Sequence, residues 1–214
     1  MSLVTLLTPL LCPRHGAIFP DMDDPRWSRF SLVNGMPVYS RAGQRRLFVI
    51  SGLHGDEASG PRAVGLWRRH ANLPDGVGAV VAPSVMPADG QRLKSGLDPN
   101  RDFSRRRMPV IDEIRGLVTE ARPDLFIDVH EDVESDEPYV FAHRSSSGDM
   151  ARLLARAMDV KARTWSAGDG GSSENVFTDL GIPSVTVEVP PTWPMSKRIA
   201  FVIRFLNEAA DLIR

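Results

Sequence analysis

Two histidines and a glutamate have the spacing of a metal site in this 214-residue chain. His54 and Glu57 lie three residues apart, and Gly55 between them lets the chain turn so that both side chains can face one ion. His130 ends a second apolar run and can supply a third ligand if the two runs form neighbouring strands. Two imidazoles and one carboxylate are a ligand set of catalytic zinc sites, which keep a fourth position for water. Each residue alone is more often an ordinary hydrogen-bonding group, but together they favour a site for one zinc ion.

Glu188 is a carboxylate inside the apolar segment 183–189. Burying an unpaired carboxylate costs several kcal/mol, so this side chain needs either a partner or a role. One alternative is a buried ion pair with an arginine. The other is a general base beside the metal site, with a pKa that burial and a nearby cation shift toward neutrality.

Asn100 and Arg101 follow a proline in a polar loop. Such a pair is often a solvated turn. A guanidinium beside an amide also matches a carboxylate through paired hydrogen bonds, which predicts a binding site for a substrate carboxylate.

An acidic run follows His130. It contains Glu131, Asp132, Glu134, Asp136 and Glu137. This run is either a solvated loop or a surface that attracts a cationic substrate group or a second ion.

The residues named above fall where short apolar runs end and helix-type runs begin. The pattern predicts strands over residues 46–51, 78–82, 125–130, 138–142 and 184–189, and helices over 57–70, 110–121, 149–158, 173–180 and 196–213. This alternation predicts an α/β fold, with a single domain, a mixed, mostly parallel twisted sheet and helices on both faces. Because ligands collect at the carboxyl ends of parallel strands, the polar segments are expected to converge on one cleft.

The N-terminal residues differ from the body of the chain. Residues 1–35 are rich in Pro, Asp and Arg with weak periodicity, so they are predicted to form an arm or cover. Residues 36–214 are predicted to form the catalytic domain.

Composition excludes several classes of function. The chain is 42% hydrophobic and 25% charged, which is typical of a globular domain and not of disorder or fibre. The 26 Lys and Arg residues nearly balance 27 Asp and Glu and are not clustered, so neither nucleic acid nor an anionic membrane is an expected partner. Neither a signal peptide nor a membrane span is evident, which predicts a soluble, cytoplasmic protein. The oligomeric state stays open.

The motifs together resemble the zinc metallocarboxypeptidases, the carboxypeptidase A-like superfamily that also includes the succinylglutamate desuccinylases and aspartoacylases. The resemblance covers Arg46 to Val189 and implies a zinc-peptidase type of phosphorylase/hydrolase-like fold. It rests on motifs in the family's order: His54-Gly55-Asp56-Glu57, Asp98-Pro99-Asn100-Arg101-Asp102-Phe103, His130, Gly170-Gly171-Ser172-Ser173, Leu180-Gly181-Ile182-Pro183 and Glu188. The chain departs from the classical enzymes in being shorter and in lacking a tyrosine at 164–169, so substrate capture is expected to differ.

The resemblance implies a role for each matched residue. It implies that the zinc ligands are His54, Glu57 and His130, that the general base and acid is Glu188, and that the substrate carboxylate is held by Asn100 and Arg101. It further implies that Arg92 polarises the scissile carbonyl and stabilises its oxyanion, that Asp98 orients His54, and that Ser173 forms the floor of the substrate side-chain pocket.

These roles imply hydrolysis of an amide by activated water, without a covalent enzyme intermediate. The leading hypothesis is a zinc metallocarboxypeptidase that removes a C-terminal residue from a peptide. The first alternative is an N-acyl-amino-acid amidohydrolase of the aspartoacylase or desuccinylase type, and the second is a non-catalytic domain that binds a carboxylate. The expected partner is a small peptide or an N-acyl amino acid with a free carboxylate.

Overall fold

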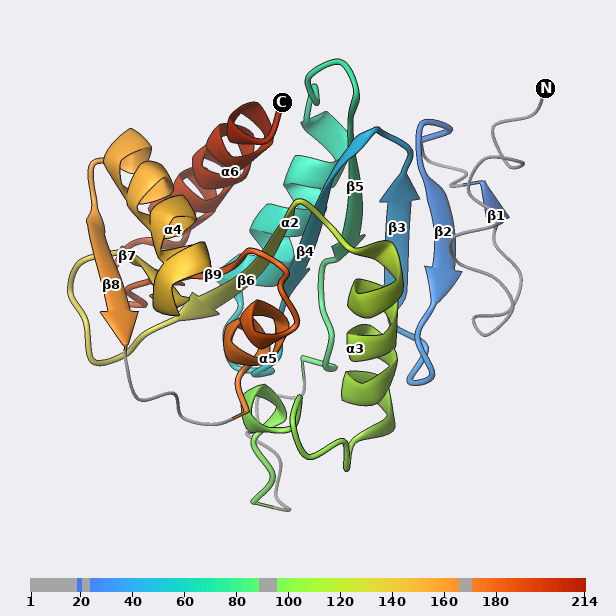
Figure 1. The fold of residues 1–214 in the computed structure, drawn as a ribbon, viewed down its shortest axis with the longest axis horizontal. Coiled ribbons are helices and arrows are strands. Elements are labelled where there is room, and N and C mark those ends of the chain that lie inside the picture. The colour runs from blue at the N-terminus through green and yellow to red at the C-terminus, as the bar shows by residue number, and fades with distance from the viewer. Residues whose placement is uncertain (1–18, 21–23, 89–95, 166–170) are drawn as a thin grey trace.

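The computed structural model describes residues 19–20, 24–88, 96–165 and 171–214. The strands in these ranges form one sheet in the order β1-β2-β3-β5-β4-β6-β9-β7-β8 (Figure 1). Their bounds are β1 Phe19–Pro20, β2 Ser28–Ser31, β3 Pro37–Arg41, β4 Arg45–Ser51, β5 Val77–Ala82, β6 Leu125–Glu131, β7 Tyr139–His143, β8 Lys161–Trp165 and β9 Ser184–Val189. The helices are α2 Ser59–His70, α3 Pro109–Ala121, α4 Arg144–Met158, α5 Ser173–Asp179 and α6 Met195–Leu212, with a short 3-10 turn, η1, at Pro99–Arg101.

The centre of the sheet is parallel, and an antiparallel pair joins it to the strands on each side. Strands β5, β4, β6 and β9 run in the same direction. Strand β3 pairs antiparallel with β5 on one side, and β7 pairs antiparallel with β9 on the other. The parallel centre brings the carboxyl ends of β4, β6 and β9 to one edge, where ligands of α/β proteins bind.

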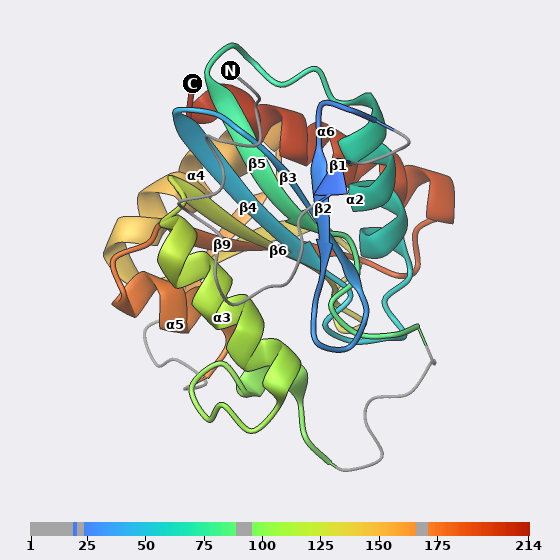
Figure 2. The same ribbon diagram turned by 90° about the vertical axis from the view of Figure 1, so that its right-hand side faces the viewer.

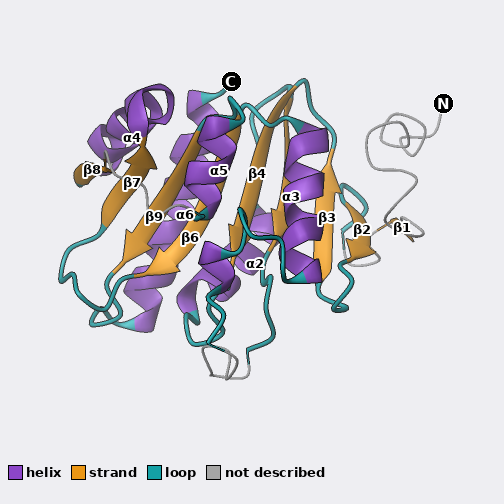
Figure 3. Cartoon of the chain, turned by 60° about the horizontal axis from the view of Figure 1, so that its bottom comes forward, coloured by secondary structure: helices purple, strands orange, loops and turns teal. Residues whose placement is uncertain are grey.

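Helices cover both faces of the sheet because the central strands are apolar on both sides. In β4, Leu47 and Val49 face a core shared with α2, α4 and α6, whereas Phe48 and Ile50 face a core shared with α3 and α5. Figure 2 shows α2 and α3 on opposite sides of the strands, and Figure 3 shows α3 and α5 in front of them. The predicted α/β fold, with a mixed sheet and helices on both faces, is confirmed.

The differences from the expected elements lie at the sheet edges. Strands β1, β2, β3 and β8 were not predicted, because they lack an apolar run: in β8, for example, residues 161–164 are exposed. β2 lies within the predicted N-terminal arm and pairs with β3 at the edge of the sheet. Helix α4 begins at Arg144 rather than at 149. Across the described ranges, no helix has the length and apolarity needed to cross a bilayer.

Candidate metal centre

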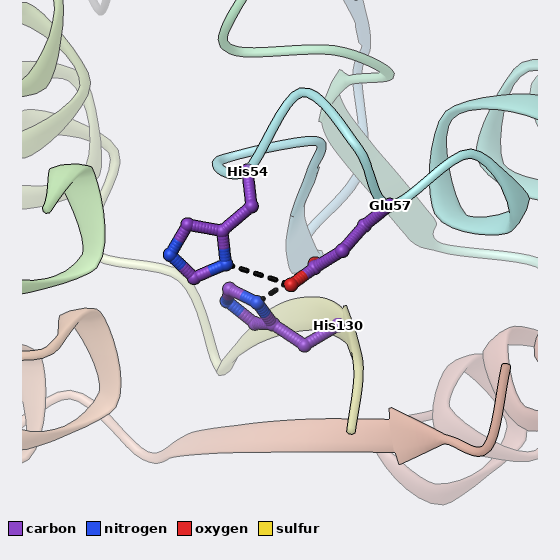
Figure 4. A group of neighbouring side chains, drawn as sticks. All are labelled: His54, Glu57 and His130. Atoms are coloured by element: carbon purple, nitrogen blue, oxygen red, sulfur yellow. Dashed lines mark hydrogen bonds and ion pairs between the residues drawn. The ribbon is translucent and has the colours of Figure 1, made fainter. Parts of the chain in front are cut away.

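The structure brings His54, Glu57 and His130 together at the carboxyl edge of the sheet. One ligand atom from each lies within 4.8 Å of the others. The Nδ1 atom of His54 lies 2.7 Å from Oε1 of Glu57, and the Nδ1 atom of His130 lies 3.0 Å from Oε2. Figure 4 shows both rings turning one nitrogen toward the carboxylate between them.

The loop between β4 and α2 places the first two residues. Gly52, with a φ of +64°, turns the chain as it leaves β4, in a space where a Cβ would approach Pro61 and Ser84 at 3.0 Å. The Glu57 N–H then donates to the His54 carbonyl at 3.2 Å, which closes a turn that puts both side chains on one side. The predicted helix therefore starts after Glu57, at Ser59.

Strand β6 places His130 beside this loop. β6 pairs in parallel with β4, with Val129 opposite Ser51. His130 is 3% exposed, and its Nε2 lies 3.1 Å from Oδ2 of Asp128, which is fully buried. Sequence reasoning gave Asp128 no role. Its position two residues before His130 was the available signal, because residues i and i+2 of a strand share a face.

Asp98 has the equivalent position behind His54. Its Oδ1 lies 3.0 Å from Nε2 of His54 and also accepts the N–H of Asn100 at 2.8 Å, at the start of η1. The family resemblance implies an orienting role for Asp98, and its carboxylate lies within hydrogen-bonding distance of His54. Both histidines therefore present Nδ1 to Glu57 and Nε2 to an aspartate, the arrangement that fixes the tautomer of metal-binding imidazoles.

The three side chains are strongly coupled in charge. Burial opposes protonation of His54, but its hydrogen bonds to Asp98 and Glu57 raise its pKa to about 9. Burial likewise opposes ionisation of Glu57, but the two histidines lower its pKa to about 2. For His130 the carboxylates of Asp128 and Glu57 outweigh burial and raise the pKa well above its ordinary value. Without a metal, protons on the imidazoles therefore balance the carboxylates.

The donor set fits a zinc ion. Oε2 of Glu57 is buried, and its contact with Nδ1 of His130 at 3.0 Å is an ion-pair contact without hydrogen-bond geometry, so a lone pair remains for another partner. Two nitrogens and a carboxylate oxygen are donors that zinc accepts, and three protein ligands leave a position for water or substrate. A bound cation would replace the protons that the imidazoles carry here.

Glu188 lies next to this cluster. On β9 it is the register partner of His130, and both side chains lie on the face opposite Val129 and Val187. Burial, with added repulsion from neighbouring carboxylates, raises the pKa of Glu188 to about 8 although the charge on His130 opposes this shift. In the described part of the chain no Arg or Lys forms an ion pair with Glu188, which disfavours the ion-pair alternative.

The remaining predicted site residues lie around the η1 turn. Asn100 and Arg101 are partly exposed on η1, two and three residues after Asp98. Ser173, at the start of α5, is fully buried, and its N–H donates to Oδ1 of Asn100 at 3.2 Å. Arg92 lies outside the described residues.

The acidic run after His130 does not act as one surface. The side chain of Glu131 is 6% exposed and pairs with Arg198, whereas Asp132 accepts a hydrogen bond from the hydroxyl of Tyr139 at 2.8 Å. Glu137, by contrast, is exposed and pairs with Lys161. These three residues therefore have separate partners. Glu131, which follows His130 in the sequence, joins β6 to α6 through its ion pair with Arg198.

Comparison with solved structures identifies the fold. A candidate metallopeptidase from Shewanella denitrificans OS217 superposes with a TM-score of 0.73 at 20% identity, over 87% of this chain and 84% of the other. A metallo-carboxypeptidase from Burkholderia cenocepacia gives 0.69 at 18% identity, and a succinylglutamate desuccinylase/aspartoacylase from Rhodobacter sphaeroides gives 0.66 at 19%. Each of these two matches covers 87% of this chain but 64% of the matched protein, which is longer.

No protein-family model matches the chain, and a search of curated proteins finds no match. The similarity to known proteins is therefore one of structure. At these identities it establishes the arrangement of the backbone, and the chemistry depends on the residues themselves. The protein shares its fold with the metallo-carboxypeptidase and the succinylglutamate desuccinylase/aspartoacylase.

Proposed function

We propose that the protein is a zinc-dependent hydrolase that cleaves an amide bond in a small substrate with a free carboxylate, with C-terminal peptide hydrolysis as the leading reaction. One observation carries this proposal. The His54, Glu57 and His130 cluster lies beside Glu188, the register partner of His130, whose pKa is raised toward neutrality. Activation of water for hydrolysis requires a metal site and a nearby carboxyl that can gain and lose a proton near pH 7.

The reaction assigns Glu188 two proton transfers. A zinc ion, when bound, supplies polarisation of the substrate carbonyl and a lowered pKa for water. The carboxylate of Glu188 accepts a proton from the attacking water. The same group then donates that proton to the leaving nitrogen as the C–N bond breaks. In the metal-free protein a pKa of about 8 keeps both protonation states of Glu188 accessible near neutral pH, and the charge of a bound zinc ion would shift this pKa downward.

The η1 turn supplies substrate recognition in this proposal. Asp98 binds His54 and also accepts the N–H of Asn100, so the turn is fixed relative to the metal ligands. Arg101 and the amide of Asn100 hold the terminal carboxylate through charge-assisted hydrogen bonds. Arg92 is proposed to stabilise the oxyanion, in keeping with the resemblance of the sequence motifs.

An N-acyl-amino-acid amidohydrolase is the second candidate. Residues 164–169 contain no tyrosine, unlike the classical carboxypeptidases that the motifs resemble, so substrate capture is proposed to differ from theirs. A succinylglutamate desuccinylase/aspartoacylase is also among the solved structures with this fold. Both candidates use the same ligands and base and differ in the acyl side of the bond.

Release of free amino acid from a panel of peptides and N-acyl amino acids tests the proposal, with zinc-loaded protein, chelated protein and chelated protein with zinc restored. Turnover that disappears on chelation and returns with zinc is the expected result, and the substrate class that reacts separates the two candidates. A protein that binds zinc and carboxylates but turns over neither class is the non-catalytic binding domain. A protein that takes up no zinc has no such centre.

A further inference from the structure

Ser173 has a hydrogen bond that a pocket-floor role does not account for. Its hydroxyl, fully buried at the start of α5, donates to Oδ2 of Asp128 at 2.5 Å. That oxygen is the atom 3.1 Å from Nε2 of His130. Ser173 therefore contacts the carboxylate that lies directly behind one of the candidate metal ligands.

Asp128 needs this support because of its burial. The residue is 0% exposed, and its Oδ1 has no hydrogen-bond partner among the described residues. A fully buried carboxylate with an unsatisfied oxygen is costly, so each hydrogen bond to the other oxygen contributes to fixing its position. The Ser173 hydroxyl is the hydrogen-bond donor on the side of α5.

The backbone of Ser173 makes a second connection. Its N–H donates to Oδ1 of Asn100 at 3.2 Å, and the Asn100 N–H in turn donates to Asp98 behind His54. The carboxylates behind the two histidines are therefore linked through one serine and one asparagine. Segments from β6, α5 and η1, which are distant in sequence, meet in this chain of hydrogen bonds.

We infer that Ser173 is a positioning residue of the metal centre: it holds Asp128, which fixes the ring of His130, and it ties this support to Asn100 on the η1 turn. The inference rests on the proposed zinc site. With a metal on Nδ1 of His130, the ring proton is on Nε2 and Asp128 must lie where it can accept it. Losing the Ser173 hydroxyl leaves Asp128, and with it the ring, less well fixed, which lowers metal affinity.

The test compares zinc affinity in the wild type, Ser173→Ala and Ser172→Ala, by competition with a chelator of known affinity. Ser172 is the matched control, since it is the neighbouring serine and its hydroxyl donates to Glu174 at 2.6 Å and not to Asp128. Loss of a group that supports a ligand typically weakens metal binding by about 10- to 100-fold, and Ser173→Ala is expected at the lower end. Ser172→Ala should bind zinc as the wild type does.

Two further readouts separate positioning from a general loss of structure. In zinc-loaded protein with labelled histidine, the Nε2 proton of His130 should give a shifted NMR signal that moves in Ser173→Ala and not in Ser172→Ala. In an Asp128→Asn background, adding Ser173→Ala should weaken zinc binding much less than it does in the parent, because the serine acts through the aspartate.

The outcomes are distinct. A wild type that binds no zinc overturns the proposed site and this inference together. A wild type that binds zinc, with equal affinity in Ser173→Ala, overturns the inference and leaves the proposed function standing. Equal losses in the two serine variants also overturn it, since they would mean general damage to the start of α5.

Discussion

His130 and Glu188 are register partners on the neighbouring parallel strands β6 and β9, with side chains on the same face of the sheet. Tyr139 continues the row on β7, where it pairs with Glu188 in the antiparallel direction. The relative position of the candidate metal ligand and the candidate base is thus set by backbone pairing in the sheet. It does not depend on a loop, so substitutions of either side chain should leave the other in place.

His130→Ala should lose zinc and turnover together, because two protein ligands hold zinc poorly. We expect zinc affinity to fall by on the order of 100-fold or more. Chelator competition and elemental analysis measure this loss. His70→Ala is the control, since His70 is exposed at the end of α2. A variant that keeps stoichiometric zinc at wild-type affinity would remove His130 from the ligand set.

Glu188→Gln should keep zinc and lose turnover. The amide has nearly the same shape but cannot accept a proton, and loss of a general base typically costs about 10²- to 10⁴-fold in rate. We expect the fall in kcat with little change in KM. Steady-state kinetics at matched zinc occupancy check it, and wild-type kcat in this variant would show that another group takes the proton.

The same substitution should change how stability depends on pH in zinc-free protein. The folded-state pKa of Glu188 is raised from 4.5 to about 8, so the native state holds this proton more tightly than the unfolded chain. The tighter binding of this proton therefore contributes fully to the free energy of unfolding of the wild type below pH 4.5, and the contribution is lost as pH rises through about 8. Because glutamine does not titrate, Glu188→Gln should gain stability relative to the wild type across this window, by up to about 5 kcal/mol once pH exceeds about 8.

Urea denaturation of chelated protein across this pH range measures the difference. The ionisation of the histidines affects both proteins, so it largely cancels in the comparison. Parallel stability curves at all pH values would mean that Glu188 ionises normally in the folded state.

Arg101→Met should raise KM for substrates with a free carboxylate. A hydrogen bond to a charged group contributes about 1.5–3 kcal/mol, which corresponds to roughly 10- to 100-fold in KM. Arg105→Met, an exposed arginine on the same loop, is the control. Substrates with an amidated C-terminus should be insensitive to the change at Arg101, and an equal KM increase for both substrate forms would contradict carboxylate binding.

Glu131→Gln should destabilise the fold. Glu131 pairs with Arg198 of α6 and accepts the N–H of Ser59 at 2.7 Å, so it joins β6 to the start of α2. Removing its charge leaves Arg198, which is 13% exposed, without its carboxylate, at a cost of about 2 kcal/mol. Thermal or urea unfolding measures this change. Glu134→Gln, in the exposed part of the same acidic run, should change stability by less than about 0.5 kcal/mol.

The parallel centre of the sheet could be predicted from sequence because its strands are apolar on both faces. β9 lies at the predicted residues 184–189, and β4 and β6 differ by one residue at one end. The edge strands could not be predicted in this way. β3 alternates buried and partly exposed residues, and β8 is polar, so neither has the run that identifies a buried strand.

The candidate site followed from sequence where spacing is local or where a polar residue interrupts an apolar strand. His54 and Glu57 are an example of local spacing, and Glu188 is a polar residue that interrupts an apolar strand. Asp128 was missed because its position two residues before His130 indicates only that both side chains lie on one face of the strand, and not that a ring nitrogen of His130 points at the carboxylate. The hydrogen bond from Ser173 to Asp128 joins residues 45 positions apart, which no spacing rule anticipates.

The ligand set is divided unequally along the chain, and this division orders the assembly of the centre. His54 and Glu57 are neighbours in sequence, but His130 joins them when β6 pairs with β4. Glu188 arrives later still, with β9, which is inserted between β6 and β7. During synthesis from the N-terminus, a growing chain can therefore complete its metal ligands before it has made its base. The centre acquires its proposed hydrolytic power when the last strand is in place.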